Sequence, residues 1–203
     1  MTKIVNRNQS TNGCNEIIDY PGQSTEIQLL IGGKHMKTQG KRIITAAAAF
    51  LALVLIDQIT KQAAVRALEG GRHIELIRGV LEFYYIQNRG AAFGIFQDGT
   101  FILSIISAVC MIALIIAYCK VPGNRKFLPL RVVLVFIAAG AAGNLIDRVY
   151  LHYVRDFIYF SLIDFPVFNV ADIYVTVSVF VLVFLLMFYY KDEDLKFDQK
   201  SGI

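Results

Sequence analysis

Charged residues are scarce in this chain of 203 residues: Asp, Glu, Lys and Arg make up 18% of it, whereas hydrophobic residues make up 56%. A soluble globular domain contains about a quarter charged residues, so this composition argues against a water-soluble enzyme. The surplus of apolar side chains also argues against disorder. The net charge is only +4, which gives no reason to expect a nucleic-acid partner.

Cysteine motifs and other common catalytic signatures are lacking as well. Cys14, Cys110 and Cys119 form no C-x-x-C pair and have no histidine at metal-ligand spacing. We expect no disulfide framework, no metal and no organic cofactor, and interpret Cys110 and Cys119 as small buried apolar residues. The sequence has no G-x-S-x-G motif, no H-E-x-x-H motif and no Gly-rich phosphate loop, which argues against serine proteolysis and zinc hydrolysis.

The most prominent feature of the sequence is its long apolar runs. A bilayer span needs roughly 20 predominantly apolar residues, and four segments approach or reach that length. They cover about residues 43–62, 101–119, 131–149 and 172–190. The first and third reach full length only when polar residues at one end are included. We therefore expect an α-helical integral membrane protein with four transmembrane helices.

Lysine and arginine collect in the three segments that share one side of a four-span protein. Residues 1–42, 120–131 and 191–203 together carry 13 of the 20 basic residues. By the positive-inside rule this places both termini in the cytoplasm and the loops 61–100 and 148–171 outside. Residues 1–42 are interpreted as a weakly structured polar extension, and residues 191–203 as a cytoplasmic tail.

An alternating pattern marks the first outer loop, at about residues 73–96. Apolar residues alternate with mostly polar ones from Ile74 to Tyr85, and Arg78-Gly79 can supply a turn. The pattern predicts a small β-hairpin or sheet at the outer membrane surface.

Ionisable and amide side chains gather at the outer ends of the spans. Ionisable groups inside a membrane are costly and usually functional. These side chains are Asp57 in the first span, Asn144, Asp147 and Arg148 in the third, and Asn169 and Asp172 in the fourth. Two structural explanations stay open. Asp147 and Arg148 could neutralise each other, and Asn169 could cap the fourth helix with Asp172 in its first turn.

Asp156 and Asp172 form a possible catalytic pair. Two carboxylates held close together share one proton, so one can take a proton from water while the other donates one. That is the chemistry of aspartic proteolysis. A small transporter or a structural membrane subunit would use the same acids, but a transporter needs polar residues throughout the bilayer, and here they stop at one face.

Five short motifs resemble those of the lipoprotein signal peptidase family (signal peptidase II), in the same order and spacing, over roughly residues 43–190. They are Asp57-Gln-Ile-Thr-Lys61, Asn88-Arg-Gly-Ala-Ala-Phe-Gly94, Gly143-Asn-Leu-Ile-Asp-Arg148, Val154-Arg-Asp-Phe157 and Phe168-Asn-Val-Ala-Asp172. Each motif alone is weak evidence for the family, but five motifs in this order on a four-span protein are specific for it.

The resemblance implies an aspartic endopeptidase of the bacterial inner membrane, with its site near the outer face. Its partner would be a membrane-embedded prolipoprotein, cut just before a cysteine that carries diacylglycerol. The resemblance places the catalytic dyad on Asp156 and Asp172. It assigns substrate binding to Asn144, Arg148 and Asn88, and support of the site to Asp57, Lys61, Asp147, Asn169 and Ala171. We expect a monomer.

Overall fold

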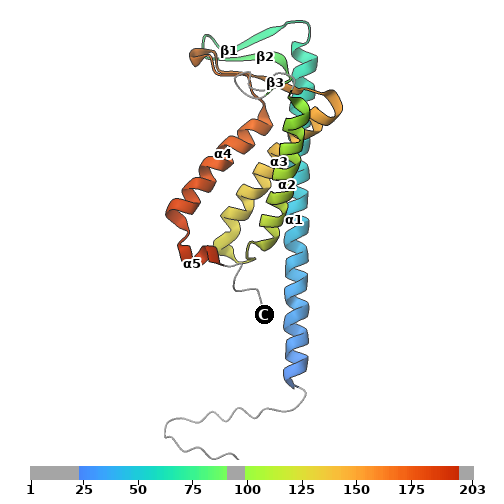
Figure 1. The fold of residues 1–203 in the computed structure, drawn as a ribbon, viewed down its shortest axis with the longest axis vertical. Helices are drawn as coiled ribbons and strands as arrows, with labels where there is room; N and C mark the ends of the chain where they lie inside the picture. The colour runs from blue at the N-terminus through green and yellow to red at the C-terminus, as the bar shows by residue number, and fades with distance from the viewer. Residues whose placement is uncertain (1–22, 91–98, 197–203) are drawn as a thin grey trace, which may run out of the picture. The chain divides into compact units, whose positions relative to one another are not determined.

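The computed structural model describes residues 23–90 and 99–196. The chain divides into two compact units, Met1–Gly40 and Lys41–Ile203. In the first unit the described residues are helical. Of the weakly structured extension expected at residues 1–42, residues 1–22 lie outside the described part and residues 23–42 are helical. The second unit holds the four apolar helices and a small sheet (Figure 1).

Four helices in the described part of the chain are long and apolar enough to cross a membrane, which confirms the predicted architecture. They are α1 (Gln23–Leu68), α2 (Thr100–Lys120), α3 (Leu128–Leu151) and α4 (Val170–Phe184), the last continued by a π-helical turn, Leu185–Tyr189. The apolar part of α1 spans Gln39–Leu68. A short helix, α5 (Asp192–Leu195), follows α4.

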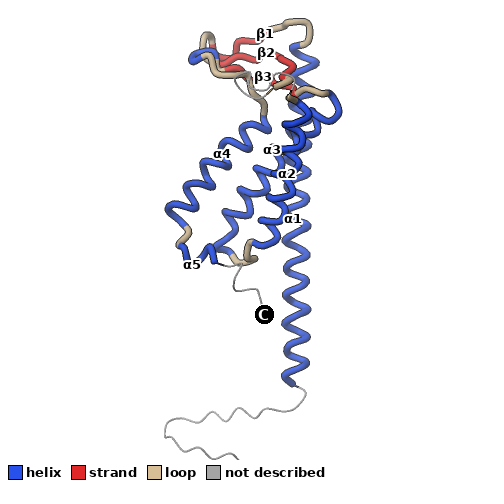
Figure 2. Tube along the Cα trace, in the orientation of Figure 1, coloured by secondary structure: helices blue, strands red, loops and turns tan. Residues whose placement is uncertain are grey.

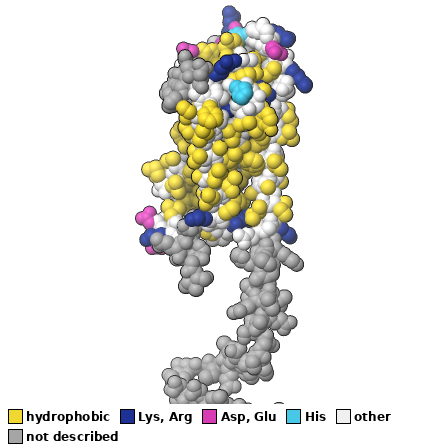
Figure 3. All heavy atoms as spheres, turned by 45° about the vertical axis from the view of Figure 1, so that its right-hand side comes forward, with side chains coloured by type: hydrophobic (Ala, Val, Ile, Leu, Met, Phe, Trp, Pro, Cys, Tyr) yellow, Lys and Arg dark blue, Asp and Glu magenta, His cyan; other side chains and the backbone are white. Residues whose placement is uncertain are grey.

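Large apolar side chains point away from the bundle. None of the residues of α2 is buried, and Figure 3 shows a broad hydrophobic band along the helices with charged side chains at either end. This arrangement fits lipid as the surrounding solvent, because lipid tails are as apolar as the side chains. The expectation that Cys110 and Cys119 are buried in the protein is wrong: both are exposed on α2.

Helix α3 packs closely against α4 because the α3 residues at the contact are small. Ala138, Ala139, Gly140, Ala142 and Gly143 are all buried. A Cβ at Gly140 would lie 2.5 Å from the Ala171 carbonyl oxygen of α4, so only glycine fits there. This close contact brings the start of α4 against the end of α3.

A three-stranded antiparallel sheet, in the order β1-β2-β3, lies at one end of the helices (Figure 2). It consists of β1 (His73–Ile77), β2 (Leu81–Asn88) and β3 (Val154–Tyr159). The predicted hairpin is confirmed, and its turn contains Gly79 at a φ of 68°. Strand β3 was not predicted, and residues 91–96 of the expected β region lie outside the described residues.

Strand β3 ties the sheet to the helices and places one acidic side chain. Asp156 pairs with Ile86 across the β2–β3 ladder, after an irregularity in the register. The neighbouring Phe157 packs with Ala64 and Leu68 of α1. The β3 strand thus carries Asp156 to the end of the bundle, where α3 ends and α4 begins.

Candidate active site

Asp156 is a buried carboxylate on β3, with only 2% of its surface exposed. Its Oδ1 accepts a hydrogen bond from Asn169 Nδ2 at 2.6 Å, and its Oδ2 accepts one from Asn88 Nδ2 at 2.8 Å. Burial and, next, the charge of Asp172 raise the pKa of Asp156 to about 7. The group therefore changes its protonation state near neutral pH.

Asp172 lies in the first turn of α4 and accepts two hydrogen bonds. Asn144 Nδ2 donates to its Oδ1 at 2.7 Å, and the backbone N–H of Asn169 donates to its Oδ2 at 3.0 Å. Asn169 Oδ1 accepts from the Asp172 N–H at 3.1 Å, which completes a capping box. The helix-cap explanation for Asn169 is therefore correct, and the same side chain also reaches Asp156.

Two amides connect the two carboxylates. Asn169 Nδ2 donates to Asn144 Oδ1 at 3.1 Å as well as to Asp156. A continuous chain of hydrogen bonds thus runs from Asp156 through Asn169 and Asn144 to Asp172. The predicted pair, from two different elements, belongs to one network.

A buried network of charged side chains contacts this hydrogen-bonded chain at Asn144. Lys61 Nζ is 2.9 Å from Asp57 Oδ2 and 3.4 Å from Asp147 Oδ2, and all three side chains are fully buried. The same Nζ donates to Asn144 Oδ1 at 2.8 Å. Asp57 Oδ1 accepts from the Ala171 N–H at 3.0 Å, which fixes the first turn of α4 to α1. All five predicted support residues, Asp57, Lys61, Asp147, Asn169 and Ala171, are thus found within this one network.

Arg155 and Gln58 complete the network, and sequence reasoning missed both. Arg155 donates to both oxygens of Asp147, through Nη2 at 2.7 Å and Nε at 3.1 Å, and also to Gln58 Oε1 at 2.7 Å. These contacts raise the pKa of Arg155, although burial opposes the rise. Asp147 is therefore paired with Arg155 and Lys61, and the alternative in which Asp147 and Arg148 neutralise each other is wrong.

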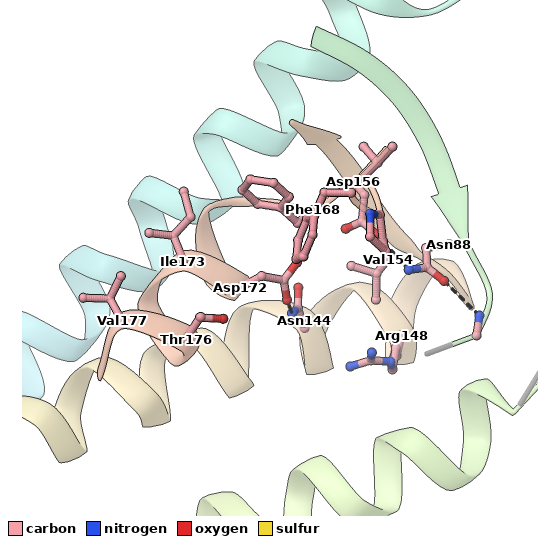
Figure 4. Close-up of a pocket in the computed structure, with 14 residues that line it drawn as sticks. Asn88, Asn144, Arg148, Val154, Asp156, Phe168, Asp172, Ile173, Thr176 and Val177 are labelled. Atoms are coloured by element: carbon pink, nitrogen blue, oxygen red, sulfur yellow. Dashed lines mark hydrogen bonds between the residues drawn. The ribbon is translucent and has the colours of Figure 1, made fainter. Parts of the chain in front are cut away.

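A cavity of about 390 Å³ opens beside the two carboxylates. Its polar wall holds the predicted substrate-binding residues Asn88, Asn144 and Arg148 together with the acidic pair (Figure 4). An apolar wall comes from the loop before α4 and from α4 itself: Phe165, Pro166, Val167, Phe168, Ile173 and Val177. Among the described residues, no group of three or more His, Cys, Asp or Glu side chains is placed to hold a metal ion.

Four spans, with two buried carboxylates that are joined through asparagine amides beside a cavity, are the features of a membrane-embedded aspartic peptidase. The family profile described as "Signal peptidase (SPase) II" matches residues 49–188. The chain therefore belongs to the signal peptidase II family, and it is a multi-pass membrane protein.

Individual relatives agree with this assignment. The chain is 40% identical to a lipoprotein signal peptidase of Clostridium novyi (strain NT) over 137 residues, which cover 66% of this chain and 91% of the relative. It is 39% identical to one of Streptococcus thermophilus (strain CNRZ 1066) over 145 residues, covering 71% and 94%. A solved structure described as a bacterial membrane enzyme superposes with a TM-score of 0.65 at 33% identity, covering 70% of this chain and 87% of that one.

Proposed function

We propose that this protein removes the signal peptides of prolipoproteins, with Asp156 and Asp172 as its catalytic dyad. The observation that carries the proposal is the pair of buried carboxylates, joined through Asn169 and Asn144 and lining one cavity. The relatives named as lipoprotein signal peptidases support the choice of substrate.

The dyad works with one proton between its two members. One carboxyl of the pair carries that proton, and its ionised partner takes a proton from a water molecule. The water oxygen attacks the scissile carbonyl carbon while the proton of the first carboxyl bonds to the carbonyl oxygen. The tetrahedral intermediate collapses when the leaving amine nitrogen takes the proton that came from water, and one hydroxyl of the intermediate returns its proton to the first carboxylate. The C–N bond breaks, the carboxyl product forms, and the dyad again holds one proton.

The cavity wall holds the substrate chain. Arg148 extends into the cavity from α3 (Figure 4), and its guanidinium makes no hydrogen bond with the described residues. It is available to bind substrate carbonyls, as are the amides of Asn144 and Asn88. The apolar wall, with Ile173 and Val177, lies next to the lipid-facing side of α4 and suits the diacylglyceryl chains of a lipidated cysteine. Cleavage just before that cysteine would place the lipid against this wall.

Membrane topology follows from the charges at the helix ends. We place both termini in the cytoplasm and the sheet, with the dyad beneath it, at the outer face of the bacterial inner membrane. Membrane-impermeant maleimide should label His73→Cys in intact spheroplasts and should label Lys191→Cys only after lysis, in a background from which the natural cysteines have been removed. The reverse labelling would invert this orientation.

We also propose that the enzyme acts as a monomer, because one chain by itself brings both acids and the asparagines that donate to them to one cavity. Protein placed singly in nanodiscs should keep the full cleavage rate per chain. A rate that depends on two copies per disc would contradict a monomeric enzyme.

The direct test is cleavage of a diacylglyceryl-modified prolipoprotein by the reconstituted protein. The parent should cleave, whereas Asp156→Asn and Asp172→Asn should not, and Asp194→Asn, on α5, is the matched control that should cleave normally. A substrate with the unmodified cysteine tests the lipid requirement and should be left uncut. Cleavage that survives both dyad substitutions would move the chemistry to other residues.

A further inference from the structure

Three asparagines donate to the dyad, and each has its own amide oxygen occupied. Asn88 Oδ1 accepts from the Gly90 N–H at 3.0 Å. Asn169 Oδ1 accepts from the Asp172 N–H at 3.1 Å. In the third, Asn144, the oxygen accepts from the ammonium of Lys61 at 2.8 Å and from Asn169 Nδ2.

These partners determine which way each amide faces. An amide has one accepting end and one donating end, and a backbone N–H or an ammonium can only donate. With its oxygen held by such a group, each amide must turn its NH₂ toward a carboxylate. Three carboxylate oxygens of the dyad consequently accept a hydrogen bond from an amide NH₂, and the fourth accepts one from the backbone N–H of Asn169. The shared proton must therefore bind at a lone pair that these donors leave free.

Lys61 differs from the other two orienting groups because it is a charged side chain. Its ammonium directs its hydrogen bonds and ion pairs to Asn144 Oδ1, Asp57 Oδ2 and Asp147 Oδ2. Neutralising the two acids explains two of these contacts, but not the shortest one, which goes to an uncharged amide. A charged donor on the amide oxygen also polarises the amide, so that its N–H groups donate more strongly.

We propose that Lys61 is a positioning residue of the catalytic reaction: its bond to Asn144 Oδ1 holds the Asn144 amide as a fixed donor to Asp172. The proposal rests on the dyad proposed above. Lys61 touches neither acid of the dyad and acts through Asn144. Without it, Asn144 would be a weaker and less strictly oriented donor, and the ionised form of the dyad would be less stable.

The test removes the ammonium without leaving a buried net charge. In the double variant Asp57→Asn/Lys61→Met, the Asn that replaces Asp57 keeps an oxygen for the Ala171 N–H. The single variant Asp57→Asn, which keeps Lys61, is the matched control, and Lys61→Arg is the conservative substitution that retains the charge. Monodispersity and helix content are measured for each variant in detergent. If the double variant does not fold, Asp57→Asn/Lys61→Gln replaces it.

The expected result is a change in the chemical step with little change in binding. Relative to Asp57→Asn, the double variant should lose about 10- to 100-fold in kcat, the effect of one charged hydrogen bond, with KM within about twofold. The alkaline limb of the kcat profile should move up by about one pH unit, since a nearby cation lowers a carboxyl pKa and Lys61 does so for Asp156. Lys61→Arg should keep the limb near its parental position.

Other outcomes would separate this proposal from the dyad itself. If the parent cleaves, but the double variant matches Asp57→Asn in kcat and in its alkaline limb, Lys61 has only a structural role. A fall in kcat with an unmoved alkaline limb would also overturn the proposal. If the parent does not cleave at all, or if Asp156→Asn retains cleavage, the proposed function fails whatever Lys61 does.

Discussion

Replacing Asp156 by Asn should stabilise the folded protein relative to the parent as the pH rises from about 4 to 7. In the unfolded chain this carboxyl ionises near its ordinary pKa of 3.8, whereas in the folded protein it keeps its proton up to about 7. Between these values the unfolded state releases a proton that the folded state retains. The parent therefore loses about 1.4 kcal/mol of folding free energy per pH unit, about 4 kcal/mol in total.

The difference between variant and parent removes every titration that the two proteins share, and it includes the response of Asp172, whose charge acts on Asp156. Asn does not titrate, and any mismatch between its NH₂ group and the donors Asn88 and Asn169 adds an offset that does not depend on pH. SDS titrations followed by far-UV circular dichroism at several pH values measure the difference; thiol-reactive dyes are unsuitable, because Cys110 and Cys119 are already exposed in the folded state. The exposed Asp164→Asn is the control. A variant-minus-parent difference that stays flat, or falls with pH, would refute the reasoning.

Three further predictions concern the groups around the dyad. Gly143→Ala should cost about 1–3 kcal/mol and slow cleavage, because its Cβ would meet the Asp57 carboxylate; an unchanged thermal midpoint would contradict this. Arg155→Met should cost about 3 kcal/mol in an SDS titration, because Asp147 loses the guanidinium that binds both its oxygens. Asn169→Ser should keep the cap of α4 within about 0.5 kcal/mol yet lower kcat, since serine has no amide to donate to the dyad; parallel losses of stability and kcat would argue against two separate roles.

The sequence predicts the elements of this protein well because its apolar runs are long. The run from Thr100 to Lys120 indicates a span by length alone, and Gly79 indicates the turn of the hairpin. Strand β3 was missed because Val154–Tyr159 has no alternation: its first four residues are all buried, whether polar or apolar.

The partners of the site residues were harder to predict than the residues themselves. The sequence placed Asp57, Asp147 and Asp172 at the ends of their spans and so predicted that they lie at one depth in the membrane. Asp147 looked paired with its neighbour Arg148, but its guanidinium partner is Arg155, which reaches it only because β3 folds back over the end of α3. Contacts of this kind depend on tertiary packing, and no local spacing reveals them.

The pairing of the buried charges bears on how the chain enters the membrane. Asp57 and Lys61 are one helical turn apart, so α1 can cross the bilayer as a segment whose two charges already neutralise each other. Asp147 finds its guanidinium partner in Arg155, shortly after α3. The α1 part of the network is thus electrically neutral on its own. The contacts of Lys61 with Asn144 and Asp147 form only when α1 and α3 associate. Asp57 and Lys61, which shape the mature site, therefore spare α1 from carrying an unpaired charge into lipid.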